Sequence, residues 1–445
     1  MKPGHPSVSR LSSAIRCRLI TEQEVVAAVL RVHPFGQVEK FIQEVYWRRY
    51  WKSWLSLRPE VWNDYRISLT EMGDSRAVRS VEKMQSGNVV IDHFVHELVT
   101  TGYLHNHARM WFAAWWVHAA RLPWQAGAAF FFRHLLDGDP ASNTLSWRGV
   151  AGLQTPGKTY LARRSNLEKY LAPELLASLS NGLAAFENPQ PQLPELAGKS
   201  PITRTDGPIE SFTLSDGDGL WIHEEDLAVE NSPLAQHAFS TVLVTAAVES
   251  WQNYDFPDSK KVWITAALHD ACTRAEQHWR VATQLETKAA HGEAILHWAK
   301  LNKLQQVVTL RPEVGPLNDS LPTLRASLAD AGIRLILIDR PEDLQIREFA
   351  TGGFFKFWER VQKKLFATPT ASASSKPPHL SIDFPPCAFP RISDLSSSQR
   401  FHPWGRTRWL LVRLMPSAML IDWWSFRCRR GQLPRTWRLH GACTV

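Results

Sequence analysis

Apolar residues recur with a helical period through the first part of the chain, residues 10–185. In the stretch GQVEKFIQEVYWRRYWKSWL, Val38, Phe41, Ile42 and Val45 have the three- and four-residue spacing that places them on one face of an α-helix. The stretches VVIDHFVHELVTTGYL and HARMWFAAWWVHAARL continue this spacing. The first part of the chain is therefore predicted to be helical.

Local signals mark where some of these helices begin and end. Thr21 and Glu24 have the spacing of a capping box, in which two side chains bond the free backbone N–H groups at a helix start. Pro123 ends the helical stretch before it, because proline cannot continue the backbone hydrogen bonds. The proline-rich stretch ENPQPQLPELAGKSP then predicts a linker.

After this linker the pattern changes to short β-rich runs that alternate with helical stretches. The runs are GLWIHEE (219–225), STVLVTAA (240–247), QQVVTL (305–310) and IRLILI (333–338). Strands that alternate with helices predict a parallel sheet. No run is followed by G-x-G-x-x-G, so the sequence gives no support for a dinucleotide site on this sheet.

These patterns predict a mainly α fold in four parts. They are a helical domain (1–186), a linker (187–205), a smaller α/β segment (206–366) and an irregular tail of low order (367–445). A chain of 445 residues is long enough for two or three domains with a sizeable core.

The composition indicates the cellular environment of the protein and the kind of partner it binds. The net charge of +8 gives mild support for a polyanionic partner, although part of the excess lies in the tail. The longest strongly apolar stretch, residues 110–120, is too short to cross a bilayer, and the first residues hold no apolar signal core. The 5 cysteines form no C-x-x-C pair, which argues against a disulfide framework and suits a reducing cytosol. We therefore expect a cytoplasmic protein without a membrane partner.

Histidines and tryptophans raise two further possibilities. His93, His96, His105 and His107 lie close in sequence, but no carboxylates accompany them at the spacing of a tetrahedral site, so no metal is predicted. The 20 tryptophans leave three explanations open: a flat aromatic ligand, an electron path, or an aromatic-rich core.

One stretch, GLQTPGKT, matches the phosphate-loop pattern G-x-x-x-x-G-K-[ST] through Gly152, Gly157, Lys158 and Thr159. A phosphate loop needs a buried strand before it and a helix after it, so that backbone N–H groups converge on phosphate oxygens. The residues before Gly152 contain no β-branched run. The match is therefore interpreted as accidental.

Three other stretches combine acidic, amide and basic side chains with tryptophan: QEVYWRRYW, TGYLHNHARM and LLDGDPASNTLSW. Their polar residues are Glu44, Asn106, Arg109, Asp137, Asp139 and Asn143. A flavin needs this mixture, because its flat apolar ring fits an aromatic slot and its nitrogens and carbonyls bind amides or carboxylates. Simpler explanations stay open: DGD as a turn, the tryptophans as core, and Glu44 as a solvated helix residue.

These stretches resemble the FAD-binding domain of the DNA photolyase/cryptochrome family. TGYLHNHARM resembles its Thr-Gly-Trp-Met-His-Asn-Arg-x-Arg-Met segment, and LLDGDPASNTLSW its Ile-Asp-Gly-Asp-x-Ala-x-Asn segment, at matching separation. SRLSSAIRCRLITEQEV resembles the family's Ser-Arg-Leu-Ser loop, and GNVVIDHFVHEL its Gly-Tyr-Pro-x-Val-Asp helix. The resemblance covers roughly residues 8–170, and it implies FAD as the cofactor.

Carried over residue by residue, the resemblance implies roles for two groups of side chains. The cofactor-binding group, with Arg109 paired to Asp137 and Asn143 facing flavin N5, is Ser9, Ser12, Asn106, Arg109, Asp137, Asp139 and Asn143. The group at the DNA lesion and on the electron path, with Trp47 stacked on the lesion, is Glu44, Trp47, Asn106, Met110, Trp147 and Trp124. Lys158, Arg163 and Arg164 could follow DNA phosphates, with a solvated loop as the alternative.

The sequence also departs from the family pattern. Gly149 stands where the family has a second tryptophan on the lesion face, and the third tryptophan of the electron path has no counterpart, although Tyr65 or Trp62 could replace it. The family's antenna domain would precede Met1, whereas here an α/β segment follows the flavin-type part. The antenna pigment and the lesion type stay open.

The resemblance implies a photolyase-type lyase that binds damaged DNA and splits pyrimidine dimers by light-driven electron transfer. The alternative is a cryptochrome-like blue-light photoreceptor without repair, which Gly149 and the missing third tryptophan favour. A non-catalytic remnant is a third possibility.

Overall fold

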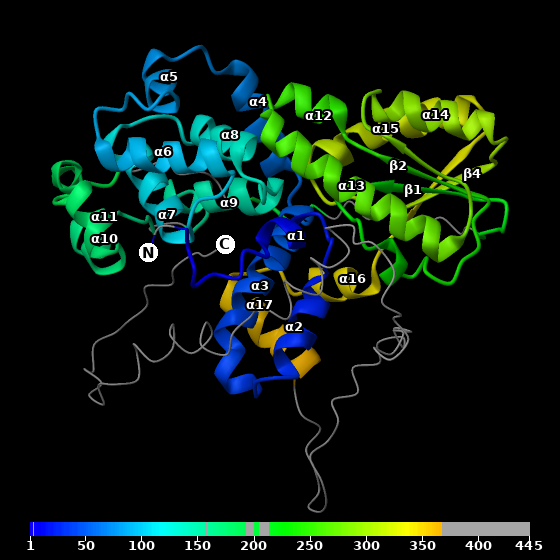
Figure 1. The fold of residues 1–445 in the computed structure, drawn as a ribbon, viewed down its shortest axis with the longest axis horizontal. Coiled ribbons are helices and arrows are strands. Elements are labelled where there is room, and N and C mark those ends of the chain that lie inside the picture. Colours follow the sequence, from blue (N-terminus) through cyan, green and yellow to red (C-terminus); the bar gives the residue numbers. More distant parts are fainter. Residues whose placement is uncertain (3, 156–157, 193–199, 204–212, 367–445) are drawn as a thin grey trace, which may run out of the picture.

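The computed structural model describes residues 1–445 except 3, 156–157, 193–199, 204–212 and 367–445. The predicted tail lies outside the described residues. The helices of the first part are α1 (Ser12–Arg16), α2 (Glu22–Leu30), α3 (Phe35–Ser56), α4 (Glu60–Glu71), α5 (Arg76–Glu82), α6 (Val89–Thr101), α7 (Asn106–Ala114), α8 (Trp124–His134), α9 (Pro140–Val150), α10 (Arg164–Tyr170) and α11 (Pro173–Ser178). In Figure 1, α5–α11 lie on the left of the view and α1, α2 and α3 lie in its lower centre.

The local signals in this part are confirmed. Thr21 is the N-cap of α2, and both hydrogen bonds of its capping box with Glu24 are present. Pro123 is the N-cap of α8, so the preceding helical stretch ends before it, as predicted. That stretch consists of α7 and a π-helical turn, Trp115–Ala119.

A parallel five-stranded sheet forms the centre of the second part. Its strands are β1 (Gly219–His223), β2 (Thr241–Thr245), β3 (Thr283–Glu286), β4 (Gln306–Leu310) and β5 (Arg334–Ile338), in the order β3-β2-β1-β4-β5. The four predicted runs are β1, β2, β4 and β5, and the predicted parallel pairing is confirmed. The sequence reading missed β3, because its residues TQLE form a short and largely polar edge strand.

Helices cover both faces of this sheet. They are α12 (Val248–Asn253), α13 (Asp258–Trp279), α14 (His291–Leu301) and α15 (Pro316–Asp330). Leu220 and Ile222 of β1 pack in the core that contains α13, whereas Trp221 between them packs in the core that contains α14 and α15. A parallel sheet buried on both faces reads as continuous apolar runs, which explains why the strand signals were strong.

The chain returns to the helical part after β5. There α16 (Pro341–Arg347) and α17 (Phe354–Val361) pack against α3, below the α/β segment in the view of Figure 1. Buried ion pairs join the two parts at this junction: Arg18 lies 2.8 Å from Asp226 and 2.7 Å from Asp343. The α/β segment is thus fixed to the helices by desolvated charges as well as by apolar packing.

Within the described residues, no helix is both long enough and apolar enough to span a membrane.

Candidate functional site

The turn Asp137–Gly138–Asp139 joins α8 to α9 and holds two buried carboxylates. Asp139 is the N-cap of α9, where its Oδ1 accepts a hydrogen bond from the Ser142 backbone N–H at 2.8 Å. Its Oδ2 lies 3.2 Å from the Lys52 ammonium group. Burial would raise the pKa of Asp139, but the nearby cations, Lys52 foremost, lower it well below its ordinary value. Asp139 is therefore ionised at neutral pH.

Asp137 forms the ion pair with Arg109 that the sequence predicted. The Nη2 atom of Arg109 lies 3.0 and 3.1 Å from the two carboxylate oxygens, and its Nε donates to the Leu104 carbonyl at 2.7 Å. Burial acts to raise the pKa of Asp137, but Arg109 and Arg48 outweigh it and hold this pKa below the ordinary value. The pair itself is confirmed, and its role in cofactor binding stays a prediction.

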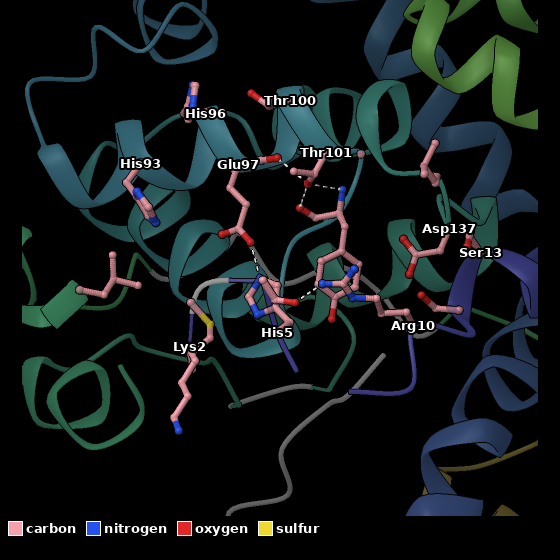
Figure 2. Close-up of a pocket in the computed structure, with 17 residues that line it drawn as sticks. Lys2, His5, Arg10, Ser13, His93, His96, Glu97, Thr100, Thr101 and Asp137 are labelled. Carbon is pink, nitrogen blue, oxygen red and sulfur yellow. Dashed lines mark hydrogen bonds and ion pairs between the residues drawn. The ribbon is translucent and has the colours of Figure 1, made fainter. Parts of the chain in front are cut away.

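A cavity of about 460 Å³ lies between the N-terminal segment, α6 and this turn. Its lining includes Ser12, Ser13, Arg10, Lys2 and Asp137, and Figure 2 shows Ser13 beside the Asp137 carboxylate. The hydroxyls and cations of this lining suit an anionic group, and the volume is in the range of ligand pockets. The rest of the lining is His5, His93, His96, Glu97, Thr100, Thr101, Gly102, Tyr103, Leu136, Leu175, Met1 and Gly4.

Three imidazole rings stack beside this cavity. The ring centroids are 5.5 Å apart for His5 and His105 and 5.4 Å apart for His105 and His107. His5 also hydrogen-bonds Glu97 through its Nε2 atom, and Figure 2 shows Glu97 reaching down from α6. Burial, followed by the neighbouring histidines, lowers the pKa of His105 to about 3. His105 is thus neutral at pH 7 and caps α7, its Nδ1 accepting from the His107 N–H.

The predicted electron-path residues continue into a row of aromatic rings. Trp147 lies directly against α8, because a Cβ added at Gly127 would come within 2.3 Å of its ring. Trp124 is the first residue of α8 and lies three residues before Gly127, so the two positions share a helix face. The Trp124 ring stacks on the Tyr65 ring, with centroids 5.6 Å apart. The centroids of the Tyr65 and Trp62 rings are 5.4 Å apart.

The predicted lesion residues lie on two helices, α3 and α7. Trp47 on α3 is 7% exposed, and one face of its ring stacks on Phe354 of α17, with centroids 3.6 Å apart and planes 8° apart. Glu44, one turn earlier on α3, is half-buried. Asn106 and Met110 are half-buried four residues apart on α7, which puts them on one side of that helix.

The remaining cofactor candidates differ in their surroundings. Asn143 of α9 is half-buried and donates its Nδ2 to the Ala128 carbonyl at 2.8 Å. Ser9 is exposed, whereas Ser12 lines the cavity and hydrogen-bonds Asp137. Of the predicted cofactor residues, the cavity therefore collects Ser12 and Asp137; its lining does not include Ser9, Asn106, Arg109, Asp139 or Asn143.

The stretch that matched a phosphate loop follows a helix. Gly152 comes two residues after α9 ends, so among the described residues a helix and not a strand leads into it, which agrees with the rejection of this motif. Lys158 and Arg163 are exposed, so both are available to a phosphate backbone. Arg164 forms ion pairs with Glu168 and Glu187. Gly157 lies outside the described residues.

Sequence reasoning missed the cations that surround the acidic turn. Arg48 and Lys52 lie four residues apart on α3, and this spacing was the available signal for a shared face. Arg16 donates to the Gly138 carbonyl at 3.0 Å. Lys260 reaches the same region from the α/β segment and donates to the Phe132 carbonyl, a contact that no sequence pattern signals. Among the described residues, no group of three His, Cys, Asp or Glu side chains could hold a metal ion.

Comparison with known proteins relates this part of the chain to photolyases. Residues 41–170 match the model described as the FAD binding domain of DNA photolyase. About a third of this chain is homologous to photolyases. The matching segment runs from α3 to α10, and it contains the acidic turn, the Arg109–Asp137 pair and Trp147.

Curated photolyases match over the same share of the chain. The deoxyribodipyrimidine photo-lyase of Streptomyces griseus is 30% identical over 151 residues, which is 34% of this chain and 33% of the relative. The Escherichia coli enzyme is 23% identical over 170 residues, 36% of this chain and 35% of the relative. The mitochondrial enzyme of Saccharomyces cerevisiae is 27% identical over 153 residues, which is 32% of this chain and 27% of the relative. The chain thus spans about a third of the length of these relatives, and no solved structure matches it significantly.

The residues around the acidic turn fit a flavin dinucleotide. The hydroxyls of Ser142 and Thr144, just after Asp139, are buried and have no hydrogen-bond partner among the described residues. Unsatisfied buried hydroxyls carry a free-energy cost that a bound ligand removes. These two hydroxyls are not part of the cavity lining, which supplies other hydroxyls and cations of the kind that bind a diphosphate.

Proposed function

We propose that this chain is an FAD-dependent, photolyase-like flavoprotein that splits pyrimidine dimers in DNA with light. The observation that carries the proposal is the Arg109–Asp137 pair, which places a buried ionised carboxylate at the cavity wall beside Ser12. The reaction class would be that of a deoxyribodipyrimidine photolyase-type lyase. When bound, reduced FAD would supply the light-driven electron that opens the dimer and would take it back.

The residues of the chain would bind and orient this cofactor. Ser12, Ser13 and Arg10 would hold the diphosphate at the cavity wall, where they provide hydroxyls and a cation. Asn143 has its Nδ2 committed to Ala128, so its carbonyl oxygen would accept from a ring N–H of the flavin. Asp137 would remain ionised through Arg109 and provide an acceptor at the same wall.

Damaged DNA is the proposed partner. Trp47 and Met110 would contact the flipped-out dimer, while Glu44 and Asn106 would hydrogen-bond its bases. The exposed cations Lys158 and Arg163, with Arg164 beside them, would follow the phosphates. These contacts would position the dimer for electron transfer and exclude competing water.

Two observations favour a second candidate, a cryptochrome-like photoreceptor without repair. Phe354 already covers one face of Trp47, so a base would need the other face of a ring that is only 7% exposed. Gly149 also lacks the side chain that would form a second aromatic wall. Flavin binding is common to both candidates, and repair separates them.

The absorption spectrum of the purified protein tests the shared part of the proposal. Oxidised-flavin bands and the release of FAD on denaturation support it. A colourless protein that also fails to take up added FAD would contradict it. Illumination of the reduced protein with a thymine dimer in single-stranded DNA then distinguishes repair from photoreception.

A further inference from the structure

Three polar side chains of the α/β segment form a hydrogen-bonded chain outside the region that matches photolyases. Nδ1 of His291 lies 2.7 Å from Oε2 of Glu249, and Nε2 of the same ring lies 2.8 Å from the Ser320 hydroxyl oxygen. Glu249 belongs to α12, His291 is the first residue of α14, and Ser320 lies near the beginning of α15. A carboxylate, an imidazole and a hydroxyl in this order are the arrangement that activates a serine for nucleophilic attack.

The three residues meet at the carboxyl edge of the parallel sheet. Glu249 follows β2, His291 follows β3 and Ser320 follows β4, and Figure 1 shows their helices in the upper part of the α/β segment. Strands β2 and β3 lie on one side of β1, whereas β4 lies on the other. The strand order therefore reverses between β1 and β4. In open α/β sheets, ligands bind at such a point, beyond the carboxyl ends of the strands.

We propose that Ser320, His291 and Glu249 form an active site that hydrolyses small uncharged esters without light, separately from the proposed flavin chemistry. The Ser320 oxygen bonds the ester carbonyl carbon, while Nε2 of His291 takes the hydroxyl proton and passes it to the departing alcohol. Water then attacks the acyl group on Ser320 and gives a proton to Nε2. The acid leaves as that proton returns to the Ser320 oxygen. One ester and one water thus become one acid and one alcohol.

The surroundings of His291 hold its ring in one orientation. Oε2 of Glu249 lies 2.7 Å from Nδ1 and accepts from the His291 backbone N–H at 3.2 Å. A proton held on Nδ1 leaves Nε2 as the acceptor that faces Ser320. The buried Trp221 ring lies parallel to the imidazole, with planes 12° and centroids 6.3 Å apart. Burial acts to raise the pKa of Glu249, but its hydrogen bonds, that of His291 foremost, outweigh this effect and keep the carboxylate ionised.

The placement of Ser320 suits a nucleophile. Helix α15 begins at Pro316, so the backbone N–H groups of Leu317 and Asn318 lie in its first turn, where a helix has no acceptor of its own for them. N–H groups at a helix start favour negative charge, such as that which develops on a carbonyl oxygen under attack. The Ser320 hydroxyl has two acceptors within reach, Nε2 of His291 and the Leu317 carbonyl at 2.7 Å, so its proton can turn to the imidazole.

The same surroundings define the class of substrate. The Glu249 side chain is 37% exposed, so its charge disfavours an anionic substrate. Ser320 is half-buried, so its oxygen is open only to a small acyl group. A short, uncharged ester meets both conditions.

Two assays of the full chain in the dark test this site. A fluorophosphonate probe reacts with activated serines: the serine oxygen bonds its phosphorus, and fluoride leaves with the hydroxyl proton. Trypsin cleaves after Arg325, so peptide mass spectrometry separates a label on Ser320 from one on Ser327. The second assay measures the hydrolysis of p-nitrophenyl acetate, which is a small uncharged ester.

The variants should affect both assays in the same order. Ser320→Ala should remove the label from its peptide and lower ester hydrolysis about a hundredfold or more, because the nucleophile is lost. His291→Gln and Glu249→Gln should slow labelling about a hundredfold, because the base or the carboxylate that fixes its tautomer is lost. Ser327→Ala is the matched control on α15, since the Ser327 hydroxyl donates to the Thr323 carbonyl at 3.0 Å. It should leave both rates within about twofold of the parent.

Reactivity is the deciding measurement, because the same hydrogen bonds also join α12, α14 and α15. If the folded parent gains no label on the Ser320 peptide and hydrolyses the ester no faster than Ser320→Ala, these contacts serve packing alone and the proposal is overturned. Labelling of His291→Gln at the parent rate would overturn the assigned base. Circular dichroism and thermal unfolding establish that each variant is folded. Neither assay uses light or flavin, so failure of the photolyase-like function would leave both results unchanged.

Discussion

The guanidinium of Arg109 bonds both carboxylate oxygens of Asp137, at 3.0 and 3.1 Å, although the two residues lie on either side of α8 in the sequence. The contact joins the ends of two motifs, and of the pair only Asp137 lines the cavity. The Arg109 side chain is 18% exposed and that of Asp137 is 4% exposed, so removal of either partner leaves a charge poorly solvated.

Asp137→Ala should therefore destabilise the protein and release its cofactor. Leaving buried cations without their partner costs about 3–5 kcal/mol. Urea unfolding of the flavin-free protein measures the stability, and the ratio of flavin to protein after gel filtration measures retention. Asp339→Ala, at a carboxylate in the α/β segment, is the control. Equal stability and flavin content in Asp137→Ala and the parent would contradict the assigned role.

Trp147→Phe should sharply slow reduction of bound flavin by blue light in the presence of a thiol. The reason is that Trp147 is the assigned first donor and phenylalanine is much harder to oxidise. Trp111→Phe is a matched control, because Trp111 is fully buried and bonds Asn166 rather than packing in the row. The assigned path is wrong if Trp147→Phe photoreduces as fast as the control.

Lys158→Ala should leave FAD content unchanged, and the parent should show no ATP hydrolysis. Helix α9 precedes Gly152, so the backbone does not form the strand-to-helix loop that binds phosphates. Isothermal titration with ATP checks this. Micromolar binding that disappears in Lys158→Ala would restore the phosphate-loop interpretation.

Acidification should destabilise the protein through His105. Its folded pKa of about 3 lies below the unfolded value of about 6.5, so between these pH values the unfolded chain binds a proton that the folded chain does not. The neutral imidazole thus contributes stability above pH 6.5, and this contribution falls as the pH drops towards 3. At pH 5 the loss from this residue reaches at most about 2 kcal/mol.

Urea unfolding at pH 7 and pH 5 measures this effect in His105→Asn, in which asparagine keeps a capping group for α7. The variant should lose less stability on acidification than the parent. His96→Asn, at an exposed position on α6, is the control variant. An identical loss in His105→Asn and the parent would show that His105 does not cause it.

Dimer binding should be weak and should respond to Gly149. A missing aromatic wall removes about 1–3 kcal/mol of base stacking, equivalent to about ten- to hundredfold in affinity. Gly149→Trp should therefore tighten binding of a thymine dimer in single-stranded DNA, and Glu44→Ala should lower the yield of light-dependent repair. If fully reduced protein photoreduces normally but repairs no dimer at any concentration, the photoreceptor candidate is preferred.

Much of the fold could be predicted from the sequence because its signals are local. The capping box at Thr21, the helix end before Pro123 and four of the five strands depend on residues close in the chain. The edge strand β3 was not predicted, because a short polar run has no hydrophobic periodicity. The resemblance to photolyases likewise came from motifs of residues close in the chain, and it predicted the pairing of Arg109 with Asp137.

Contacts between distant segments were decided only by the tertiary structure. The covering of Trp47 by Phe354 joins residues about three hundred positions apart, and the bond from Trp62 to Asp319 joins the two parts of the chain. Neither contact has a sequence period, because burial and hydrogen-bond geometry depend on how whole helices pack. The sequence therefore determined which chemical groups are present, whereas packing decided which rings are covered and which carboxylate each cation or indole meets.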